Sequence, residues 1–371
     1  MCKPLATLAF VLSVLASGTT DAQAPRPIFP AAAWEQVDPQ DLGWSGSKLE
    51  EARKYFGTLP PASIVVVDRG QIVAEWGDPA LRIKVSSIRK SLLSALYGIY
   101  VRQGRFDLNE NLGQLGIDDD PPLTTQEKQA TLRMLLESRS GVYHSYVGGT
   151  PSMKAEQPVR GSHVPGTFWY YNNWDFNTLG TIFERQLNSK IAVEFHDKIA
   201  TPTHMQDFRV EDMYYLRASS DPQVNDRSIH PMYHFRMTAR DLARFGYLYL
   251  RRGSWNGTQV VPADWVEEST RSYSDTNEGD GYGYLWWVNS FGLSEKNFSA
   301  WGSLGKYLVV IPERELVVAY LNHTEWPDNA PTIPVTELSK LPTVTRSQMG
   351  QLLKLLLDAQ HAKSSPGKHS P

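Results

Sequence analysis

Cysteine is almost absent from this chain of 371 residues, and the single one, Cys2, stands at the extreme N-terminus. A chain with one cysteine forms no internal disulfide and offers no thiolate cluster to a metal ion. An excess of either charge is also missing, because 37 basic residues stand against 40 acidic ones and the formal net charge is −3. Without a strong positive field the sequence predicts no nucleic-acid partner.

Long apolar runs are lacking too, apart from residues 5–16. Lys3 precedes this run and Ala22-Gln23-Ala24 follows it, which is the pattern of a signal peptide. The run is shorter than the roughly 20 residues that a membrane-spanning helix needs. We therefore expect residues 1–24 to be cleaved near Ala24, a secreted or periplasmic mature protein, and no stable membrane insertion.

The rest of the chain has the composition of a globular protein, with 41% hydrophobic and 21% charged residues. Four prolines in residues 25–45 predict an extended lead-in. Valine-rich and leucine-rich segments predict strands at residues 63–68 and 71–76, and again at residues 306–311 and 315–322, so a β-hairpin is expected near each end. The polar residues 362–371 predict a disordered tail.

Helical periodicity dominates between the two hairpins. The simplest arrangement is an α/β fold of the α+β kind, in which an antiparallel sheet is flanked by terminal helices and a mainly helical lobe is inserted. We expect one domain over residues 46–361. Its sheet lobe takes residues 46–85 and 280–361, its helical lobe takes residues 86–279, and a cleft lies between the lobes.

Two common hydrolase signatures are missing, since the chain has neither a Gly-x-Ser-x-Gly elbow nor a His-Glu-x-x-His zinc helix. His230 and His234 have the i, i+4 spacing of helical metal ligands, but Pro231 between them disfavours a helix. They are expected to be structural or surface histidines. We predict no metal and no cofactor.

Ser-x-x-Lys occurs four times, and only Ser87-Ile-Arg-Lys90 opens a long apolar helix. On a helix these two side chains lie about one turn apart, so the amine reaches the hydroxyl. A partly buried lysine at a helix N-terminus loses proton affinity and can act as a base that activates the serine. The alternative is an N-cap serine beside a solvated lysine.

A second motif lies in residues 165–173, where a turn runs into a helix and Tyr170 and Asn172 form Tyr-x-Asn. A phenol held partly ionised beside an ammonium can relay the serine proton, and an amide can fix the lysine and the substrate. The alternative for this aromatic segment is core packing.

With these motifs the chain resembles the serine β-lactamase-related family, which includes class C β-lactamases, D-alanyl-D-alanine carboxypeptidases, D-aminopeptidases, family VIII carboxylesterases and 6-aminohexanoate-dimer hydrolases. The resemblance covers residues 40–325 and extends to three further segments, residues 131–142, 237–246 and 281–287. It implies the two-lobed β-lactamase/transpeptidase-like fold with the catalytic serine at the cleft.

The resemblance also implies roles for individual residues. Ser87 is expected to be the nucleophile, Lys90 its base and Tyr170 the proton relay, with Asn172 as a polar group that orients the substrate. The N–H groups of Ser87 and Ser303 are expected to form the oxyanion hole.

The family's third motif, Lys-Thr-Gly or His-x-Gly, corresponds here to Trp301-Gly302-Ser303. Its usual cation is absent, which argues against β-lactam or peptidoglycan substrates. The site is more similar to the Trp-Gly-Gly of some family VIII esterases, although Lys306 remains a possible replacement for the cation. Other residues are expected to line the cleft, with packing as the alternative for each; they are Tyr143, His144, Trp286, Trp287, Trp301 and Gly302.

The sequence thus predicts a secreted serine hydrolase of the carboxylesterase or amidase type. It would cleave an ester or amide bond of a small molecule or short oligomer through an acyl-enzyme on Ser87. One alternative is a D-stereospecific peptidase or carboxypeptidase of the penicillin-binding type. A further alternative is a binding protein of the same fold that has lost its catalytic activity.

Overall fold

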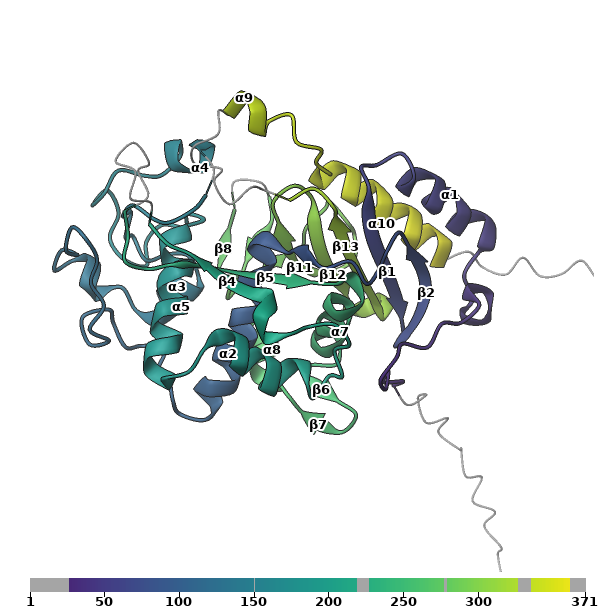
Figure 1. Cartoon of the computed structure of the whole chain (residues 1–371), viewed down its shortest axis with the longest axis horizontal. Helices are drawn as coiled ribbons and strands as arrows, with labels where there is room; N and C mark the ends of the chain where they lie inside the picture. Colours follow the sequence, from purple (N-terminus) through teal and green to yellow (C-terminus); the bar gives the residue numbers. More distant parts are fainter. Residues whose placement is uncertain (1–26, 150, 219–226, 277–278, 326–334, 361–371) are drawn as a thin grey trace, which may run out of the picture.

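A computed structural model describes residues 27–149, 151–218, 227–276, 279–325 and 335–360 of the chain (Figure 1). The expected signal peptide, residues 1–24, and the expected tail, residues 362–371, lie outside these ranges. Residues 27–37 contain no helix and run along the body of the protein, where the Tyr247 hydroxyl donates to the Ile28 carbonyl over 2.7 Å. A 3-10 turn, η1 (Pro39–Leu42), follows.

An eight-stranded antiparallel sheet forms the centre of the fold, in the order β2-β1-β13-β12-β11-β10-β9-β8. The two predicted hairpins are its first four strands, and they pair through β1 and β13, with Val65 opposite Ala319. This confirms that the two ends of the chain build one sheet. The strands are β1 (Ala62–Asp68), β2 (Gln71–Trp76), β8 (Ser274–Asp275), β9 (Gly281–Tyr282), β10 (Trp287–Val288), β11 (Phe298–Gly302), β12 (Lys306–Ile311) and β13 (Leu316–Asn322).

Both faces of this sheet are covered by helices (Figure 1). Because side chains alternate along a strand, Ile64 and Val66 of β1 enter one hydrophobic cluster and Val65 and Val67 enter the other. The two terminal helices, α1 (Gly46–Phe56) and α10 (Arg346–Gln360), pack against each other and cover the first face. The expected flanking by terminal helices is therefore present.

The helix α7 (Ala239–Leu250) covers the opposite face, against β1, β12 and β13. The predicted helical lobe, residues 86–279, includes this helix, whereas in the structure the helix packs on the sheet. Gly246 explains the contact. An added Cβ there would lie 2.6 Å from Cγ1 of Val317 and 2.7 Å from Cδ1 of Leu308, so only glycine lets the helix approach the sheet this closely.

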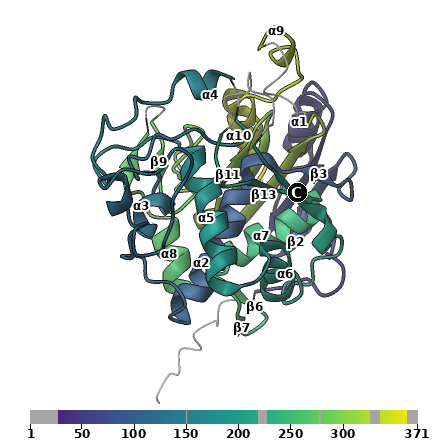
Figure 2. The same ribbon diagram turned by 60° about the vertical axis from the view of Figure 1, so that its left-hand side comes forward.

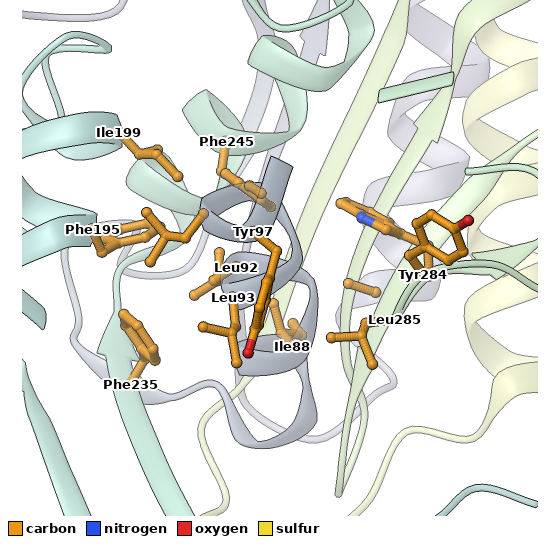
Figure 3. Close-up of a cluster of buried hydrophobic side chains, with 14 of the residues drawn as sticks. Ile88, Leu92, Leu93, Tyr97, Phe195, Ile199, Phe235, Phe245, Tyr284 and Leu285 are labelled. Atoms are coloured by element: carbon orange, nitrogen blue, oxygen red, sulfur yellow. The ribbon is translucent and has the colours of Figure 1, made fainter. Parts of the chain in front are cut away.

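The helical part is built around α2 (Arg89–Arg102), which lies beside α5 (Asn173–Leu187) in Figure 2. Figure 3 shows Leu92, Leu93 and Tyr97 of α2 between Phe195 and Phe235 on one side and Leu285 on the other. The remaining helices are α3 (Leu132–Leu136), α4 (Pro151–Ala155), α6 (Ile191–Phe195), α8 (Ala263–Ser269) and α9 (Val335–Leu338), and the short turns are η2 (Ser86–Ile88), η3 (Glu127–Gln129), the π-turn η4 (His196–Ala200), η5 (Val210–Asp212) and η6 (Pro312–Arg314).

A small sheet in the order β3-β5-β4 lies in the helical part, and β6 and β7 form a separate hairpin. His234 belongs to a strand, and His230 precedes it in a non-helical segment, as Pro231 indicated; both side chains are buried. No helix in the part of the chain that the structure describes combines the length and apolarity needed to cross a membrane. These strands are β3 (Ile83–Lys84), β4 (Met213–Leu216), β5 (Met232–Met237), β6 (Ser254–Trp255) and β7 (Thr258–Gln259).

The contact at Gly246 gives a test of the fold. In Gly246→Ala the new methyl group must displace Val317 or Leu308, and we expect the free energy of unfolding to fall by about 1–2 kcal/mol despite the better helix propensity of alanine. Urea unfolding of the two proteins measures this. Gly46→Ala, where the added Cβ meets only the movable end of Gln40, is the control. An unchanged or increased stability of Gly246→Ala would contradict the packing described here.

Candidate active site

Ser87 is presented by a strained turn at the junction of the small sheet and α2. Val85 is still tied to the small sheet, since its N–H donates to the Phe235 carbonyl over 3.0 Å. Ser86 then adopts the left-handed conformation with φ of 50°, and η2 leads from Ser86 into α2. A non-glycine residue in this conformation is uncommon and often marks a functional site.

Strand β11 of the large sheet passes directly beside this turn. A Cβ at Gly302 would lie 2.4 Å from the Val85 carbonyl oxygen, so the glycine of the third motif allows the strand to approach the Val85 backbone. The end of β11 and the start of α2 therefore meet at Ser87. The expected cleft between sheet and helices lies at this place.

A buried amine connects a hydroxyl and a phenol at the site. The Lys90 Nζ lies 2.6 Å from Oγ of Ser87 and 2.7 Å from Oη of Tyr171, within hydrogen-bond distance of both. The side chain also lies over the rings of Tyr171 and Phe176, at 4.6 Å and 4.7 Å from their centres, and Lys90 is 1% exposed. The structure thus brings Ser87 and Lys90 together as the spacing predicted.

The tyrosine of this cluster is Tyr171, and the prediction that placed Tyr170 there is wrong. The Tyr170 hydroxyl donates to the Met153 carbonyl over 2.9 Å, and its ring packs edge-on against Tyr143. The two neighbouring side chains leave the segment before α5 in different directions. Because the sequence reads Tyr-Tyr-Asn-Asn, the Tyr-x-Asn pattern fits residues 170–172 and 171–173 equally well, and the fold selects the second.

Asn172, predicted to orient the substrate, is the N-cap of α5 instead. Its Oδ1 accepts a hydrogen bond from the Trp174 N–H over 3.2 Å. Its Nδ2 donates to the Val142 carbonyl over 2.7 Å and to the Asp175 carboxyl group over 2.9 Å. With its amide engaged and 1% of its surface exposed, Asn172 fixes the helix start and is not among the residues lining the cavity.

Burial controls the protonation of the cluster. Loss of solvent, and secondarily the Arg89 charge, lowers the pKa of Lys90 well below its usual value, which favours the neutral amine. Burial raises the pKa of Tyr171 to about 12 and that of Tyr170 to about 12, so both phenols are protonated near neutral pH. For Tyr171, desolvation outweighs the hydrogen bond with Ser87 and the Arg89 charge, which argues against the expected partly ionised phenol.

Ser87 and Tyr171 open on a cavity of about 800 Å³ between the two parts of the fold. Its wall is rich in aromatic side chains, and Trp301, Gly302 and Ser303 all line it, as the sequence predicted. Trp287 also lines it and stacks on Trp301, with ring centres 4.1 Å apart and an angle of 6° between the planes. The other lining residues include Met153, Glu156, Pro158, Phe168, Trp169, Tyr170, Thr276, Tyr307, Thr343 and Arg346.

Three residues predicted to line the cleft do not line this cavity. Trp286 is fully buried in the core beside Phe245 and Tyr249, because it precedes the cavity residue Trp287 and neighbouring residues point to opposite sides. Tyr143 is 5% exposed, and its hydroxyl is bonded to His163. The ring of His144 is buried and bonded to the Pro121 carbonyl over 2.8 Å. The substrate-binding predictions for Tyr143 and Trp286 are therefore wrong.

Lys306 does not replace the cation missing from the third motif. Its amine donates to the carbonyl oxygens of Ser303 and Thr324, over 3.2 Å and 2.6 Å, and it is fully buried behind the cavity wall. Burial lowers its pKa to about 8. Lys306 thus holds the turn that carries Ser303, whose N–H stays a predicted member of the oxyanion hole.

Arg346 is one of the cavity residues that the sequence did not predict. It starts α10, its guanidinium lies 4.2 Å from the centre of the Trp301 ring, and it forms an ion pair with Asp280. No local pattern singles it out, because α10 follows the last resemblance segment and reaches the cavity only through the fold. Within the residues that the structure describes, no group of three or more histidine, cysteine or acidic side chains is suited to hold a metal ion.

An antiparallel sheet covered by helices, with a serine–lysine pair where the end of an inner strand meets a buried helix, defines the class of β-lactamase/transpeptidase-like proteins. The family comparison makes the assignment specific: residues 48–335 match the family model described as Beta-lactamase, and the chain belongs to that family. This membership supports a serine hydrolase of the β-lactamase fold.

Individual relatives are distant. A Bacillus anthracis protein provisionally assigned as a 6-aminohexanoate-dimer hydrolase has a TM-score of 0.61 and 19% identity, over 83% of this chain and 81% of its own. A family VIII carboxylesterase has a TM-score of 0.59 and 15% identity, over 85% of this chain and 99% of its own. An uncharacterized protein of Alkalihalophilus pseudofirmus is 23% identical over 69% of this chain and 82% of its own. At these identities the structural matches establish the fold alone.

The two adjacent tyrosines allow a matched test of the cluster. Tyr171→Phe removes the hydroxyl bonded to Lys90, and we expect the reaction of Ser87 with esters to slow by about 100-fold or more. Tyr170→Phe removes a hydroxyl that is bonded to the Met153 carbonyl and to Tyr146 and keeps the ring, so the rate should stay within about threefold of the unmodified protein. Rates with a para-nitrophenyl ester measure both. Equal losses in the two variants would contradict the assignment of Tyr171.

Proposed function

We propose that this protein is a secreted serine hydrolase that cleaves an ester or amide bond of a small molecule or short oligomer through an acyl-enzyme on Ser87. One observation carries the proposal. The hydroxyl of Ser87, the amine of Lys90 and the phenol of Tyr171 form a continuous hydrogen-bonded chain, and this chain opens on an aromatic cavity.

Acylation follows from the protonation states of the cluster. The neutral Lys90 amine accepts the Ser87 proton while Oγ attacks the substrate carbonyl carbon. The oxygen of the tetrahedral intermediate is then stabilised by the N–H groups of Ser87 and Ser303. As the bond to the leaving group breaks, the protonated Tyr171 phenol donates its proton to that group and takes one from the Lys90 ammonium. The products of this half-reaction are a neutral alcohol or amine and an ester on Ser87.

Hydrolysis of the acyl-enzyme reverses the proton path. A water molecule enters where the leaving group was and gives a proton to the Tyr171–Lys90 pair as its oxygen attacks the ester carbonyl. Collapse of the second tetrahedral intermediate returns a proton to Ser87 and releases the acid. No metal or cofactor is needed for either half-reaction.

The lining of the cavity supports an apolar substrate. Phe168, Trp169, Trp287 and Trp301 offer aromatic surface to an acyl or alcohol group. Trp301 stands where the family's third motif carries a cation, and the nearby guanidinium of Arg346 is paired with Asp280. A substrate that depends on a free cation for its carboxylate is therefore disfavoured.

Secretion is part of the proposal and rests on the N-terminal sequence. A short positive start, an apolar run and the Ala22-Gln23-Ala24 site together are typical of an exported protein. We propose cleavage after Ala24 and a secreted or periplasmic location.

Ser87→Ala tests the proposed activity. It removes the nucleophile, and we expect turnover of the best substrate to fall by about a thousandfold or more. The screen of the purified protein contains para-nitrophenyl esters, simple amides, D-amino-acid amides and a β-lactam. The control is Ser94→Ala, which removes another buried serine hydroxyl about two helical turns further along α2. This variant should keep full activity.

The same screen separates the alternatives. Preferential cleavage of D-amino-acid amides would favour the D-stereospecific peptidase. Turnover of the β-lactam would overturn the preference for apolar esters and amides. If Ser87 is not labelled by a fluorophosphonate and none of the substrates is cleaved, the protein is a binding protein of this fold and the proposed hydrolase is excluded.

The pH dependence follows from the neutral base. A lysine whose pKa is lowered is neutral, and competent as a base, above that pKa and is protonated below it. Acylation should therefore fall on the acid side as protons bind Lys90. Since the pKa of Tyr171 is about 12, no loss from phenol ionisation is expected up to about pH 10. Pre-steady-state acylation rates between about pH 5 and pH 10 measure this, and a flat profile contradicts it.

A further inference from the structure

Arg89 is a buried cation beside the proposed base, and neither half-reaction uses it. It is fully buried, at 0% exposed, directly before Lys90 at the start of α2. A guanidinium keeps its positive charge in proteins, and burying a charge is costly unless it is well paired. A charged arginine buried at this position therefore needs a structural or functional explanation.

The partners of Arg89 are neutral. Its Nη2 donates to Oδ1 of Asn177 over 3.0 Å, and its guanidinium lies over the Tyr233 ring, 4.2 Å from the ring centre. Its Nε and Nη1 have no hydrogen-bond partner among the described residues, and no carboxylate in those ranges forms an ion pair with it. Arg244 on α7 is equally buried, but several backbone carbonyls accept hydrogen bonds from it.

We propose that Arg89 is a positioning residue that acts through Lys90: its uncompensated positive charge, fixed by Asn177 and Tyr233, keeps the neighbouring amine neutral and ready to accept the Ser87 proton. This inference rests on the proposed function. The physical basis is that two cations one residue apart in a dry environment repel each other, and only lysine can give up its charge.

The other titratable groups around the pair do not compensate this charge. Burial raises the pKa of Tyr233 and of Tyr171 to about 12, so neither phenol is an anion near neutral pH. Burial lowers the pKa of His234 on β5 well below its usual value, with Arg89, Lys84 and Lys90 adding to the shift.

The surrounding carboxyl groups are engaged elsewhere. Asp175 on α5 is bonded to Ser140 and Asn172, and burial raises its pKa well above its usual value. Glu325 is paired with Arg236 of β5. The Arg89 charge is therefore felt by Lys90 without a counter-charge, and the same direction appears in the lowered pKa of Lys90.

The test follows the rate of Ser87 labelling by a fluorophosphonate as a function of pH, with the full chain, so that no natural substrate is needed. Arg89→Met removes the charge, and Asn177→Asp keeps Arg89 but places a carboxylate on it. In both variants the acid limb of the pH–rate profile, where the labelling rate falls as the pH is lowered, should move to higher pH. At a fixed pH on that limb labelling should slow about tenfold, and at high pH the rates should converge.

Two controls match these variants. Arg244→Met removes an equally buried arginine away from the site and should leave the acid limb in place. Asn177→Leu removes the hydrogen bond that fixes Arg89 without adding a charge, so its acid limb should move less than that of Asn177→Asp. The position of the limb does not depend on the fraction of folded protein, so a loss of stability does not hide the result.

The outcomes distinguish a failure of the Arg89 inference from a failure of the proposed hydrolase function. Ser87-dependent labelling with an unmoved acid limb in Arg89→Met and Asn177→Asp overturns the role of Arg89 and leaves the hydrolase intact. A uniform fall at every pH would show a merely structural arginine and also overturn the role. Absence of Ser87 labelling in the unmodified protein would remove the proposed function and this inference together.

Discussion

The dry surroundings of one amine are the constraint on which the rest of the site depends. Lys90 accepts a proton from Ser87 only if it has none of its own, and in water a lysine at neutral pH is protonated. Exclusion of water requires that the start of α2 be covered on every side. The inner strand β11, the segment before α5 and the small sheet supply this cover, so the meeting of sheet and helices creates the dry environment that the proposed base needs.

That cover has a cost in stability. The first residues of α2, from Arg89 to Ser91, are polar and nearly or fully buried, where apolar residues would pack more favourably. Local partners offset part of the cost: Ser91 donates to the Leu285 carbonyl over 2.6 Å, and Arg89 donates to Asn177. Three of the four buried polar residues of α2 stand at the start of the helix, beside Ser87 and the cavity, and the apolar core of Figure 3 packs around the turns that follow. A site of this kind is retained for chemistry and not for stability.

The sequence predicted features that depend on residue composition and spacing, and it missed features that depend on the direction in which a side chain points. The hairpins were predictable because their strands are rich in valine and leucine, and the Ser87–Lys90 pair because helical spacing fixes it. The tyrosine prediction was wrong by one residue, and of the two tryptophans predicted to line the cleft only Trp287 does. Adjacent side chains face different sides of the chain, and only the tertiary structure fixes which side faces the cavity. Arg346 was not predictable, because it reaches the cavity from a helix beyond all the recognised motifs.

A row of stacked rings along the cavity explains why Tyr171 and Trp287, and not their neighbours Tyr170 and Trp286, belong to the site. Tyr171 stacks on Trp287 with ring centres 5.5 Å apart, Trp287 stacks on Trp301, and the Arg346 guanidinium lies over Trp301. The row connects the phenol of the hydroxyl–amine–phenol chain to strand β11, which the predicted oxyanion donor Ser303 directly follows. In the match to the family's third motif, Trp301 occupies the position expected to carry a cation, so an aromatic ring contributes apolar surface to the cavity there. Because Trp287 is stacked between Trp301 and Tyr171, the row packs against the phenol that lies beside Lys90.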